Sequence, residues 1–290
     1  MIYLFTALYC EAHMLIQQFQ LTKNPKNTWL QEFRNEAAGI TLIITGVGEI
    51  AAASAVGGVC AAYRPKREDM LLNVGICAHT EESEGIFLCN KITEQATGKT
   101  FYPDMLYRHE FREAAAVTGM QPWSRETDGA GPSAGGLGDL AVTFPSGTLY
   151  DMEAAAVYQA GACFFGPHQM IFLKVVSDRG AAGAVSQKQT EQLMEKYRDP
   201  VVDYIRQIQV ISEKEIGTHD QEEAMLEQLC ADLHCSRAMR DSMRQYIRYL
   251  TLAGGEYVPM IQKMYEEGLL PCRDKREGKQ RFEEFKRRVF

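Results

Sequence analysis

The sequence has no apolar stretch long enough to cross a membrane. A spanning helix needs roughly 20 consecutive apolar residues, whereas Glu49 interrupts the richest stretch of this chain and glycines break the others. The apolar opening, residues 1–10, has no basic leader and no small-residue cleavage pattern, and Glu11 and His13 follow it at once. We therefore expect a cytoplasmic protein without a secretory signal and without a membrane partner.

Paired cysteines are also missing. The eight cysteines are scattered without a Cys-x-x-Cys pair, and several lie inside apolar runs, where a cysteine packs as a small hydrophobic side chain. No disulfide is predicted. The nearest approach to a metal cluster is Cys230, His234 and Cys235. On a helix Cys230 and His234 would share one face, but this set leaves a tetrahedral site short of ligands, so we expect no metal.

The chain lacks an excess of positive charge. Its formal net charge of −7 at pH 7 argues against nonspecific nucleic-acid binding by the whole chain, because neutralising phosphates needs a basic surface. One local exception lies at residues 273–290, which hold eight Lys or Arg against four Asp or Glu. We interpret this segment as a solvated amphipathic helix of mixed charge in preference to a nucleic-acid patch.

The 290 residues, 46% of them apolar, suffice for one large or two smaller domains. Short continuous apolar runs, bounded by glycine or polar residues, are typical of strands that are covered on both faces. Four such runs occupy residues 2–8, 40–45, 70–77 and 169–177.

Helical patterns separate these runs. Residues 49–63 are rich in alanine, residues 151–165 repeat apolar positions at helical spacing behind Asp151 as N-cap, and residues 186–210 open with a Ser-x-x-Gln capping box. A shorter helix is expected over 11–20. Alternating strands and helices predict an α/β fold with a central, mostly parallel mixed sheet flanked by helices. Ligands of such sheets collect at the carboxyl ends of strands.

The pattern changes after residue 211. Residues 220–252 and 256–268 have helical spacing and no strand-like run. We therefore predict an α/β domain over residues 1–212 and a helical extension over residues 213–290.

Three carboxylates stand where the predicted strands and helices meet. Glu11 follows the first strand, Glu153 lies in the first turn of a helix, and Asp178 closes the strongest strand. Each has a structural alternative: the two glutamates could complement helix dipoles, and Asp178 could pair with Arg179 or Lys174. Their positions nevertheless make them candidates for one site at the mouth of the sheet.

Two glycine-containing segments lie near the same predicted edge. Gly46 and Gly48 connect a strand to a small-residue helix, which lets backbone N–H groups approach a ligand oxygen or lets the helix pack tightly on the sheet. The three-glycine spacing of a dinucleotide site is absent. Gly75 would permit a backbone bulge beside a ligand.

Taken in order, these motifs resemble the nucleoside phosphorylase and nucleosidase superfamily, and most closely the 5′-methylthioadenosine/S-adenosylhomocysteine nucleosidases. The resemblance covers about residues 1–210 and implies a nucleoside phosphorylase-like fold. The motifs are Ala7-Leu8-x-x-Glu11, Thr45 to Ala53, Asn73 to Ala78, Phe144-Pro145, Asp151 to Ala154 and Val176-Ser177-Asp178.

The resemblance implies roles for particular residues. Glu153 would accept hydrogen bonds from the ribose hydroxyls, and Met152 would pack on the sugar. Asp178 would protonate the purine leaving group, and Glu11 would orient and activate water. Further substrate-binding positions would be Gly46, Gly75, Ile76 and Ser177. An N-glycosidic bond breaks through an oxocarbenium-like state, so the base needs a proton and the sugar cation needs nearby negative charge.

The resemblance also bears on the nucleophile. Phosphorylase members typically bring arginines to the phosphate from the first loop and from the strand that ends here at residues 73–75. This chain has Tyr9, Cys10 and His13 in the first region and no arginine near the second. Hydrolysis of a purine nucleoside, without an organic cofactor, is therefore expected. Relatives assemble as dimers or larger rings, which implies a homo-oligomer.

Two departures from the family pattern keep alternatives open. Ile76 stands where nucleosidases usually carry serine, which removes a hydroxyl expected near the sugar and its water. The segment whose aromatic ring stacks on adenine falls in the glycine-rich residues 127–138, expected to be a surface loop, with Ala130 near the place of a Phe. We expect core or surface roles for Tyr102 and Trp123. The alternatives are a weak or inactive nucleoside-binding module and a phosphate-dependent phosphorylase.

Overall fold

The protein divides into two compact units, Met1–Glu213 and Lys214–Phe290, each described by itself. The computed structural model describes residues 1–124, 145–180, 185–252 and 257–289. The first unit is an α/β domain and the described part of the second is helical, so the fold class predicted from the sequence is confirmed. The glycine-rich residues 127–138 lie outside the described residues.

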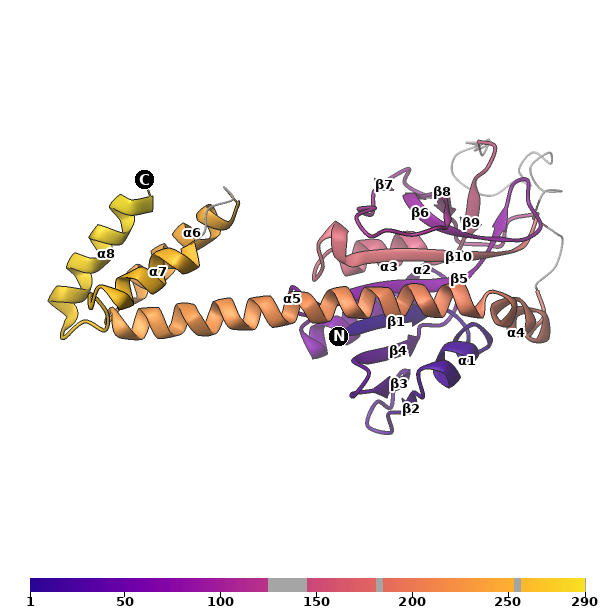
Figure 1. The fold of residues 1–290 in the computed structure, drawn as a ribbon. Coiled ribbons are helices and arrows are strands. Elements are labelled where there is room, and N and C mark those ends of the chain that lie inside the picture. The colour runs from indigo at the N-terminus through magenta and orange to yellow at the C-terminus, as the bar shows by residue number, and fades with distance from the viewer. Residues whose placement is uncertain (125–144, 181–184, 253–256, 290) are drawn as a thin grey trace. The chain divides into compact units, whose positions relative to one another are not determined.

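A 10-stranded sheet forms the middle of the first unit (Figure 1). Its strands are β1 (Ile2–Thr6), β2 (Thr22–Lys23), β3 (Gln31–Asn35), β4 (Ile40–Ile44), β5 (Met70–His79), β6 (Gly85–Glu94), β7 (Thr100–Phe101), β8 (Arg112–Thr118), β9 (Leu149–Asp151) and β10 (Met170–Asp178). The strand order is β10-β6-β8-β9-β5-β1-β4-β3-β2, and β7 pairs with β6. Because β10 also pairs with β5, the strands β5, β10, β6, β8 and β9 form a closed ring of pairings.

The strand directions decide where a ligand can bind. The strands β4, β1, β5 and β10 are joined by parallel pairings, whereas β10–β6 and β5–β9 are antiparallel. The carboxyl ends of β1, β5 and β10 therefore meet at one edge of the sheet, which is the edge where α/β proteins bind ligands. All four strands predicted from apolar runs are confirmed, as β1, β4, β5 and β10.

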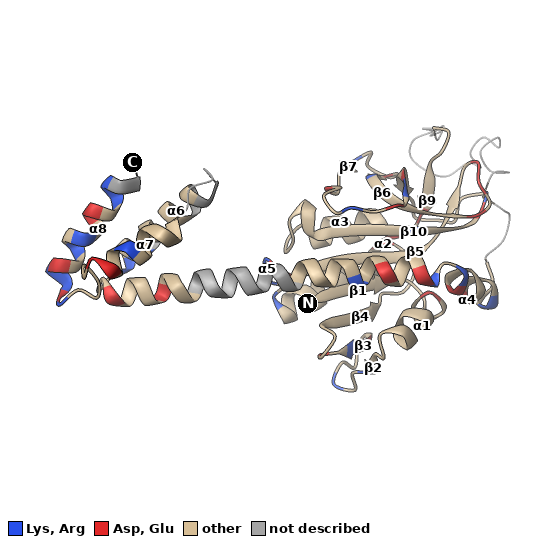
Figure 2. Ribbon diagram, viewed as in Figure 1, with Lys and Arg blue, Asp and Glu red and all other residues tan. Residues whose placement is uncertain are grey.

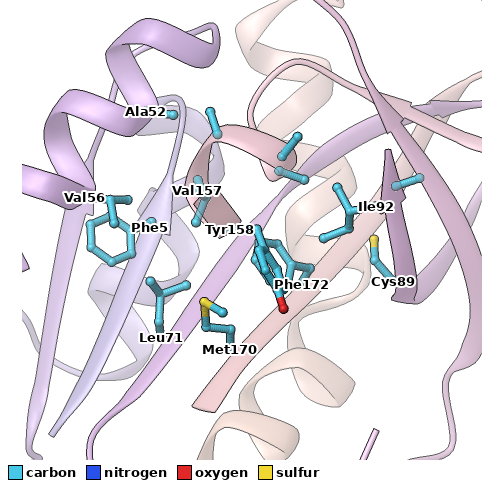
Figure 3. Close-up of a cluster of buried hydrophobic side chains, with 14 of the residues drawn as sticks. Phe5, Ala52, Val56, Leu71, Cys89, Ile92, Val157, Tyr158, Met170 and Phe172 are labelled. Carbon is cyan, nitrogen blue, oxygen red and sulfur yellow. The ribbon is translucent and has the colours of Figure 1, made fainter. Parts of the chain in front are cut away.

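One face of the sheet is covered by α2 (Glu49–Tyr63) and α3 (Ala154–Gly161). Figure 3 shows the core between them, in which Phe5 and Phe172 of the sheet meet Val56 and Val157 of the helices. All four side chains are fully buried. The alanine-rich composition of α2 and α3 lets these helices pack closely on each other and on the strands.

The other face is covered by α1 (Tyr9–Gln18), α4 (Gln187–Lys196) and the first part of α5 (Arg198–Asp232). Leu4 and Leu173 of the strands pack there with Leu15 of α1 and Ile205 of α5. Strands that bury side chains on both faces must be apolar at successive positions, which explains their continuous apolar runs.

The helix predicted over residues 151–165 is shorter in the structure. Asp151 is the last residue of β9, and α3 begins at Ala154 with Glu153 in the N-cap position. Asp151 nevertheless caps the helix from the strand, since its Oδ2 accepts hydrogen bonds from the backbone N–H groups of Glu153 (3.3 Å) and Ala154 (2.8 Å).

The prediction of a single helix over residues 186–210 is wrong, because the segment forms two helices. The helix α4 ends at Lys196 and α5 begins at Arg198, with Tyr197 between them at φ −100° and ψ 16°. Pro200 explains the interruption. Inside a continuous helix its ring would collide with the Lys196 carbonyl, whereas in the first turn of a new helix it is tolerated.

The second unit contains the end of α5, α6 (Arg237–Leu252), α7 (Tyr257–Glu266) and α8 (Lys275–Val289). Its own apolar core includes Leu229, Leu233, Ile261, Met264 and Phe285. None of the helices formed by the described residues is both long enough and apolar enough to span a membrane.

The turn after α5 corrects the predicted arrangement of Cys230 and His234. The helix ends at Asp232, and His234 has a left-handed φ of 49°. The N–H of Cys235 then bonds to the Cys230 carbonyl (2.9 Å), as in a Schellman ending. The two residues therefore do not share a helical face. Within the described residues no group of three or more His, Cys, Asp or Glu side chains is arranged to hold a metal ion.

Basic and acidic residues are mixed along α8, as Figure 2 shows. Arg281 pairs with Glu284 (2.8 Å) and Lys286 with Glu283 (2.6 Å). These local pairs use part of the basic charge that the sequence concentrates at residues 273–290. They favour a solvated helix of mixed charge over a surface for nucleic acid.

Candidate active site

The structure brings Glu11, Glu153 and Asp178 to the wall of one cavity of about 500 Å³. They arrive from three elements: Glu11 from α1, Glu153 from the start of α3 and Asp178 from the end of β10. Of the other residues predicted for the site, those that line this cavity are Met152, Ile76 and Ser177. Gly46 and Gly75 do not line the cavity. Gly75 leaves room for the Glu11 carboxylate, and Gly46 supports the turn that binds Glu153.

Glu11 is held by backbone N–H groups. Its Oε2 accepts hydrogen bonds from Ala7 and Leu8 (both 2.9 Å), and its Oε1 accepts one from Ile76 (2.8 Å). The side chain is only 2% exposed. Burial raises the pKa of this carboxyl above its ordinary value, and the three N–H donors oppose that shift without cancelling it. The carboxylate is therefore fixed in position and more basic than an exposed glutamate.

Gly75 makes the position of Glu11 possible. A Cβ atom at residue 75 would lie 2.9 Å from Glu11 Oε1, closer than such contacts occur. The bulge that Gly75 would permit does not form there, because the β5–β10 register stays regular at Gly75 and shifts between Val176 and Asp178 instead. This irregularity lies directly before Asp178, and such irregularities characteristically redirect a side chain.

The turn that contains Gly46 and Gly48 binds Glu153. The N–H of Gly48 donates to Glu153 Oε1 (2.8 Å), and Gly48 has a φ of 98°, which favours glycine. Gly46, at φ 84°, supports the same turn through its N–H bond to the Ala7 carbonyl (3.1 Å). The turn thus orients a carboxylate at the cavity.

The pKa of Glu153 is raised to about 7. Burial is the main cause and the nearby Asp151 carboxylate the second, whereas Lys174 and the Gly48 N–H oppose the shift. The exposed fraction of the residue is 8%. Near neutral pH this carboxyl is therefore poised between its two protonation states, and a ligand that donates hydrogen bonds would favour the charged one.

A buried ion pair lies behind Glu153. Lys174 Nζ contacts Asp151 Oδ2 at 2.6 Å, and the Thr118 hydroxyl donates to Asp151 Oδ1 at 2.6 Å. Burial alone would lower the pKa of Lys174, but the charges of Asp151 and Glu153 outweigh it and raise the pKa. The alternative in which Lys174 pairs with Asp178 is therefore wrong. The one sequence signal for this pair was a lysine inside the apolar run of β10.

Asp178 accepts hydrogen bonds at both carboxylate oxygens. The Ser177 hydroxyl donates to Oδ2 (2.7 Å) and the Gly180 N–H donates to Oδ1 (2.8 Å). These bonds hold the carboxylate at the cavity wall, where it can face a bound molecule.

The rest of the described lining is largely apolar. It includes Leu8, Val47, Ile76, Pro122 and Trp123, and no lysine or arginine occurs among the described lining residues. Trp123 was expected to have a core or surface role, but in the structure it lines the cavity. Tyr102 is 60% exposed, which agrees with a surface role.

Comparison with known proteins supports the fold assignment. No protein-family model matches the sequence, and no curated protein matches it either. Among solved structures, a Helicobacter pylori 5′-methylthioadenosine/S-adenosyl homocysteine nucleosidase is similar, with 11% identity, a TM-score of 0.54, and coverage of 71% of this chain and 96% of that chain. A Helicobacter pylori futalosine hydrolase mutant has 11% identity and a TM-score of 0.54, covering 71% and 97%.

A third similar structure is a Streptococcus pneumoniae MTA/SAH nucleosidase in complex with 8-aminoadenine. It has 14% identity and a TM-score of 0.52, with coverage of 73% of this chain and 98% of that chain. The chain therefore has the nucleosidase fold. Within that class its solved neighbours include several 5′-methylthioadenosine/S-adenosylhomocysteine nucleosidases, which confirms the fold expected from the motifs.

Proposed function

We propose that this protein hydrolyses the N-glycosidic bond of a purine nucleoside of the 5′-methylthioadenosine or S-adenosylhomocysteine type. The observation that carries the proposal is that Glu11, Glu153 and Asp178 border one cavity of about 500 Å³. Cavities of about 300–1,000 Å³ are typical of small-molecule sites. The neighbours of the same fold, one of them solved with 8-aminoadenine, support the substrate class.

The three carboxyl groups divide the work of breaking the bond. Asp178, in its acid form, gives a proton to the base as the bond from nitrogen to the sugar breaks. Glu153 accepts hydrogen bonds from the ribose hydroxyls and stabilises the positive charge that develops on the sugar. Glu11 accepts a proton from the water whose oxygen bonds to the anomeric carbon. That proton later leaves Glu11, and Asp178 is reprotonated, so the enzyme returns to its starting state.

The surroundings of Glu11 support its role as the base. A general base is most effective when its pKa lies near the working pH, and burial raises the pKa of this carboxyl above its ordinary value. The three backbone N–H bonds hold it in one orientation. Orientation matters because a misplaced base loses much of its effect on the rate.

The composition of the cavity wall supports water as the nucleophile. Recognition of phosphate typically uses arginine, lysine or several aligned backbone donors. Neither arginine nor lysine occurs among the described lining residues, and Lys174 is occupied by Asp151. Phosphorolysis is the alternative, and a requirement for phosphate in the assay would establish it.

We also propose a homodimer or a larger homo-oligomer. The first unit exposes several large apolar side chains, among them Ile50 (78%), Leu106 (68%) and Met120 (68%). Covering such side chains in a subunit interface would remove them from water, which favours association. A monomeric mass in light scattering at micromolar concentration would contradict this proposal.

A nucleoside-binding module without turnover is the second candidate. It is favoured by Ile76, whose side chain lines the cavity where the related nucleosidases usually have a serine hydroxyl. The presence of all three carboxylates at the cavity favours the enzyme.

The test is to incubate the purified chain with 5′-methylthioadenosine, S-adenosylhomocysteine, adenosine and inosine and to measure the free base by chromatography, with and without phosphate. We expect base release without phosphate. Asp178→Asn should abolish turnover and leave nucleoside affinity nearly unchanged, because the amide keeps the size of the side chain but cannot supply the proton. Equal turnover by this variant would remove Asp178 from the mechanism. Binding without base release by the wild-type chain would support the second candidate.

A further inference from the structure

The turn that ends α5 brings two cysteines together. Cys230 lies in the last turn of the helix, and Cys235 directly follows His234, which has a left-handed φ of 49°. The N–H of Cys235 donates to the Cys230 carbonyl (2.9 Å), and the N–H of His234 donates to the Ala231 carbonyl (3.0 Å). These are the two hydrogen bonds of a Schellman ending, which frequently places the side chains of its first and last residues in contact.

The thiols of these two cysteines meet in the core of the helical unit. Cys230 is 2% exposed and belongs to that core, and Cys235 is half-buried and packs against it. A hydrogen bond joins the two thiols, and this bond, together with burial, raises the pKa of Cys235. All eight cysteines of the chain are free in the structure. Cys230 and Cys235 are therefore a reduced dithiol.

A disulfide between these residues requires little movement of the backbone. Two cysteines can be bridged when their Cα atoms lie within about 7 Å of each other. The 2.9 Å hydrogen bond from Cys235 to Cys230, with the covalent bonds on either side of it, keeps the two Cα atoms within about that distance. The third cysteine of this unit, Cys272, is turned to another partner, since its thiol donates to the Leu269 carbonyl (3.7 Å).

The same turn joins three segments of the helical unit. Cys235 lies just before α6, which begins at Arg237. The Cys272 N–H donates to the Asp232 carbonyl (2.8 Å), and His234 Nε2 donates to the Cys272 carbonyl (3.0 Å). A covalent link at this turn would fix the end of α5 to the start of α6 and to the segment before α8.

We infer that Cys230 and Cys235 are a redox-modification site, which a low-molecular-weight disulfide such as oxidised glutathione converts to a reversible disulfide that fixes the turn between α5 and α6. The inference does not depend on the proposed hydrolysis. The competing interpretation is that the two cysteines serve only as the apolar contact that accompanies a Schellman ending.

The exchange balances in two steps. The thiolate of Cys235, the more exposed cysteine, attacks one sulfur of the oxidant, whose S–S bond breaks so that one glutathione leaves as a thiolate and takes up a proton. The thiolate of Cys230 then attacks the Cys235 sulfur, which breaks the mixed disulfide and releases the second glutathione. The two protein thiols lose two protons and two electrons, and one small disulfide is reduced to two thiols.

Peptide mapping of the whole chain tests the inference. The native protein is equilibrated with oxidised glutathione for many hours, because the raised pKa of Cys235 makes its thiolate scarce. Free thiols are then alkylated and the chain is digested with trypsin. Residues 231–234 contain no lysine or arginine, so both cysteines stay in one peptide. We expect that peptide to lack two hydrogen atoms and to resist alkylation until dithiothreitol is added.

Three results of the mapping would overturn the inference. They are a peptide in which both cysteines are still alkylated, a peptide that carries glutathione on either cysteine at equilibrium, and a link from either cysteine to Cys272. Cys272→Ser is the matched control and should form the disulfide to the same extent as the wild type. Cys235→Ser should form none and should leave Cys230 reduced, because Cys230 is only 2% exposed.

Urea unfolding followed by helical circular dichroism tests whether the disulfide fixes the turn. It is measured in Cys163→Ser, because Cys163 is exposed and would itself take up glutathione. The helical unit should unfold at a higher urea concentration when oxidised than when reduced, because the disulfide restricts the unfolded chain. The tryptophan-detected transition should not move, since both tryptophans lie in the first unit. Identical unfolding of the two forms would overturn the claim that the turn is fixed.

Discussion

At the scale of single residues, the site concentrates negative charge that the protein must hold out of water. Glu11, Glu153 and Asp151 are all buried, and Lys174 is the cation that they share through their electrostatic interactions. The pKa of Glu153, raised to about 7, is the measurable consequence. Ionising the buried Glu153 carboxyl at the cavity therefore costs folding free energy, as is common for groups at functional sites.

The raised pKa of Glu153 predicts how stability depends on pH. In the unfolded chain this group titrates near 4.5 and in the folded chain near 7. Its contribution to stability is complete below pH 4.5 and is lost as the pH rises through 7, because the unfolded chain releases the proton first. The loss is at most about 3 kcal/mol.

Urea unfolding of the wild type and of Glu153→Gln at pH 5 and pH 8 checks this prediction. The glutamine can still accept the Gly48 hydrogen bond but cannot ionise, so the variant should lose less stability between the two pH values than the wild type. Identical losses in both proteins would contradict the assigned pKa.

Gly75→Ala tests the packing of Glu11. The added Cβ would lie 2.9 Å from Glu11 Oε1 and must displace the carboxylate from its three N–H donors. We expect base release to fall by at least about tenfold, because a positional change of this kind costs orientation at the reacting centre. Steady-state kinetics provide the measurement.

A glycine without close neighbours provides the control for this substitution. A Cβ atom at Gly57, in α2, meets nothing within 4 Å. Gly57→Ala should therefore preserve base release and stabilise the helix by up to about 1 kcal/mol. Unchanged activity in Gly75→Ala would show that Glu11 tolerates displacement.

At the scale of elements, the ion pair of Lys174 and Asp151 ties β10 to β9 across the ring of pairings. Thr118 of β8 joins the pair through its hydrogen bond to Asp151 and accepts the N–H of Ala155 in α3. Four elements therefore meet at one buried polar cluster. Fully paired clusters of this kind hold elements in a single arrangement.

Lys174→Met should destabilise the protein by about 3–5 kcal/mol, because it leaves the Asp151 carboxylate buried without its cation. Asp151→Leu in the same chain should recover part of that loss, since the double variant buries no unpaired charge. Lys196→Met, at an exposed pair with Glu84, is the control and should have little effect. Denaturant unfolding measures all three. If Lys174→Met lowers the free energy of unfolding no more than Lys196→Met does, the Lys174–Asp151 pair does not stabilise the fold.

At the scale of the whole molecule, each unit has its own apolar core. Phe172 is buried in the first unit and Phe285 in the second. Both tryptophans, Trp29 and Trp123, belong to the first unit. Tryptophan emission therefore reports on the first unit alone.

Removal of each core phenylalanine tests whether the units unfold separately. Phe285→Ala should destabilise the helical unit by about 3–5 kcal/mol and leave the tryptophan-detected transition in place. Phe172→Ala should lower that transition. Helical circular dichroism, recorded in parallel, follows both units. A shift of the tryptophan transition in Phe285→Ala equal to that in Phe172→Ala would indicate one cooperative molecule.

Local patterns in the chain were sufficient to predict the class of fold. Continuous apolar runs indicate doubly covered strands because every side chain of such a strand must leave water. The capping box at Ser186 and Gln189 forms as predicted, since its hydrogen bonds join residues three positions apart. The interruption at Tyr197 was missed because the prediction followed the apolar periodicity past Pro200, although a proline inside a helical pattern usually marks the end of one helix or the start of the next.

Contacts between distant residues were decided by the tertiary structure. The partner of Lys174 depends on how β10 and β9 are placed around the ring of strands, and neighbouring residues in the chain carry no record of that placement. The same reason explains Trp123, whose surroundings include Gly180 from a remote turn. Residue order alone was enough to suggest carboxylates near the ends of strands. Which of these groups share a cavity was decided only by the folded chain. The pairing of distant strands around the ring brings their ends together, and the sequence alone does not show which strands pair.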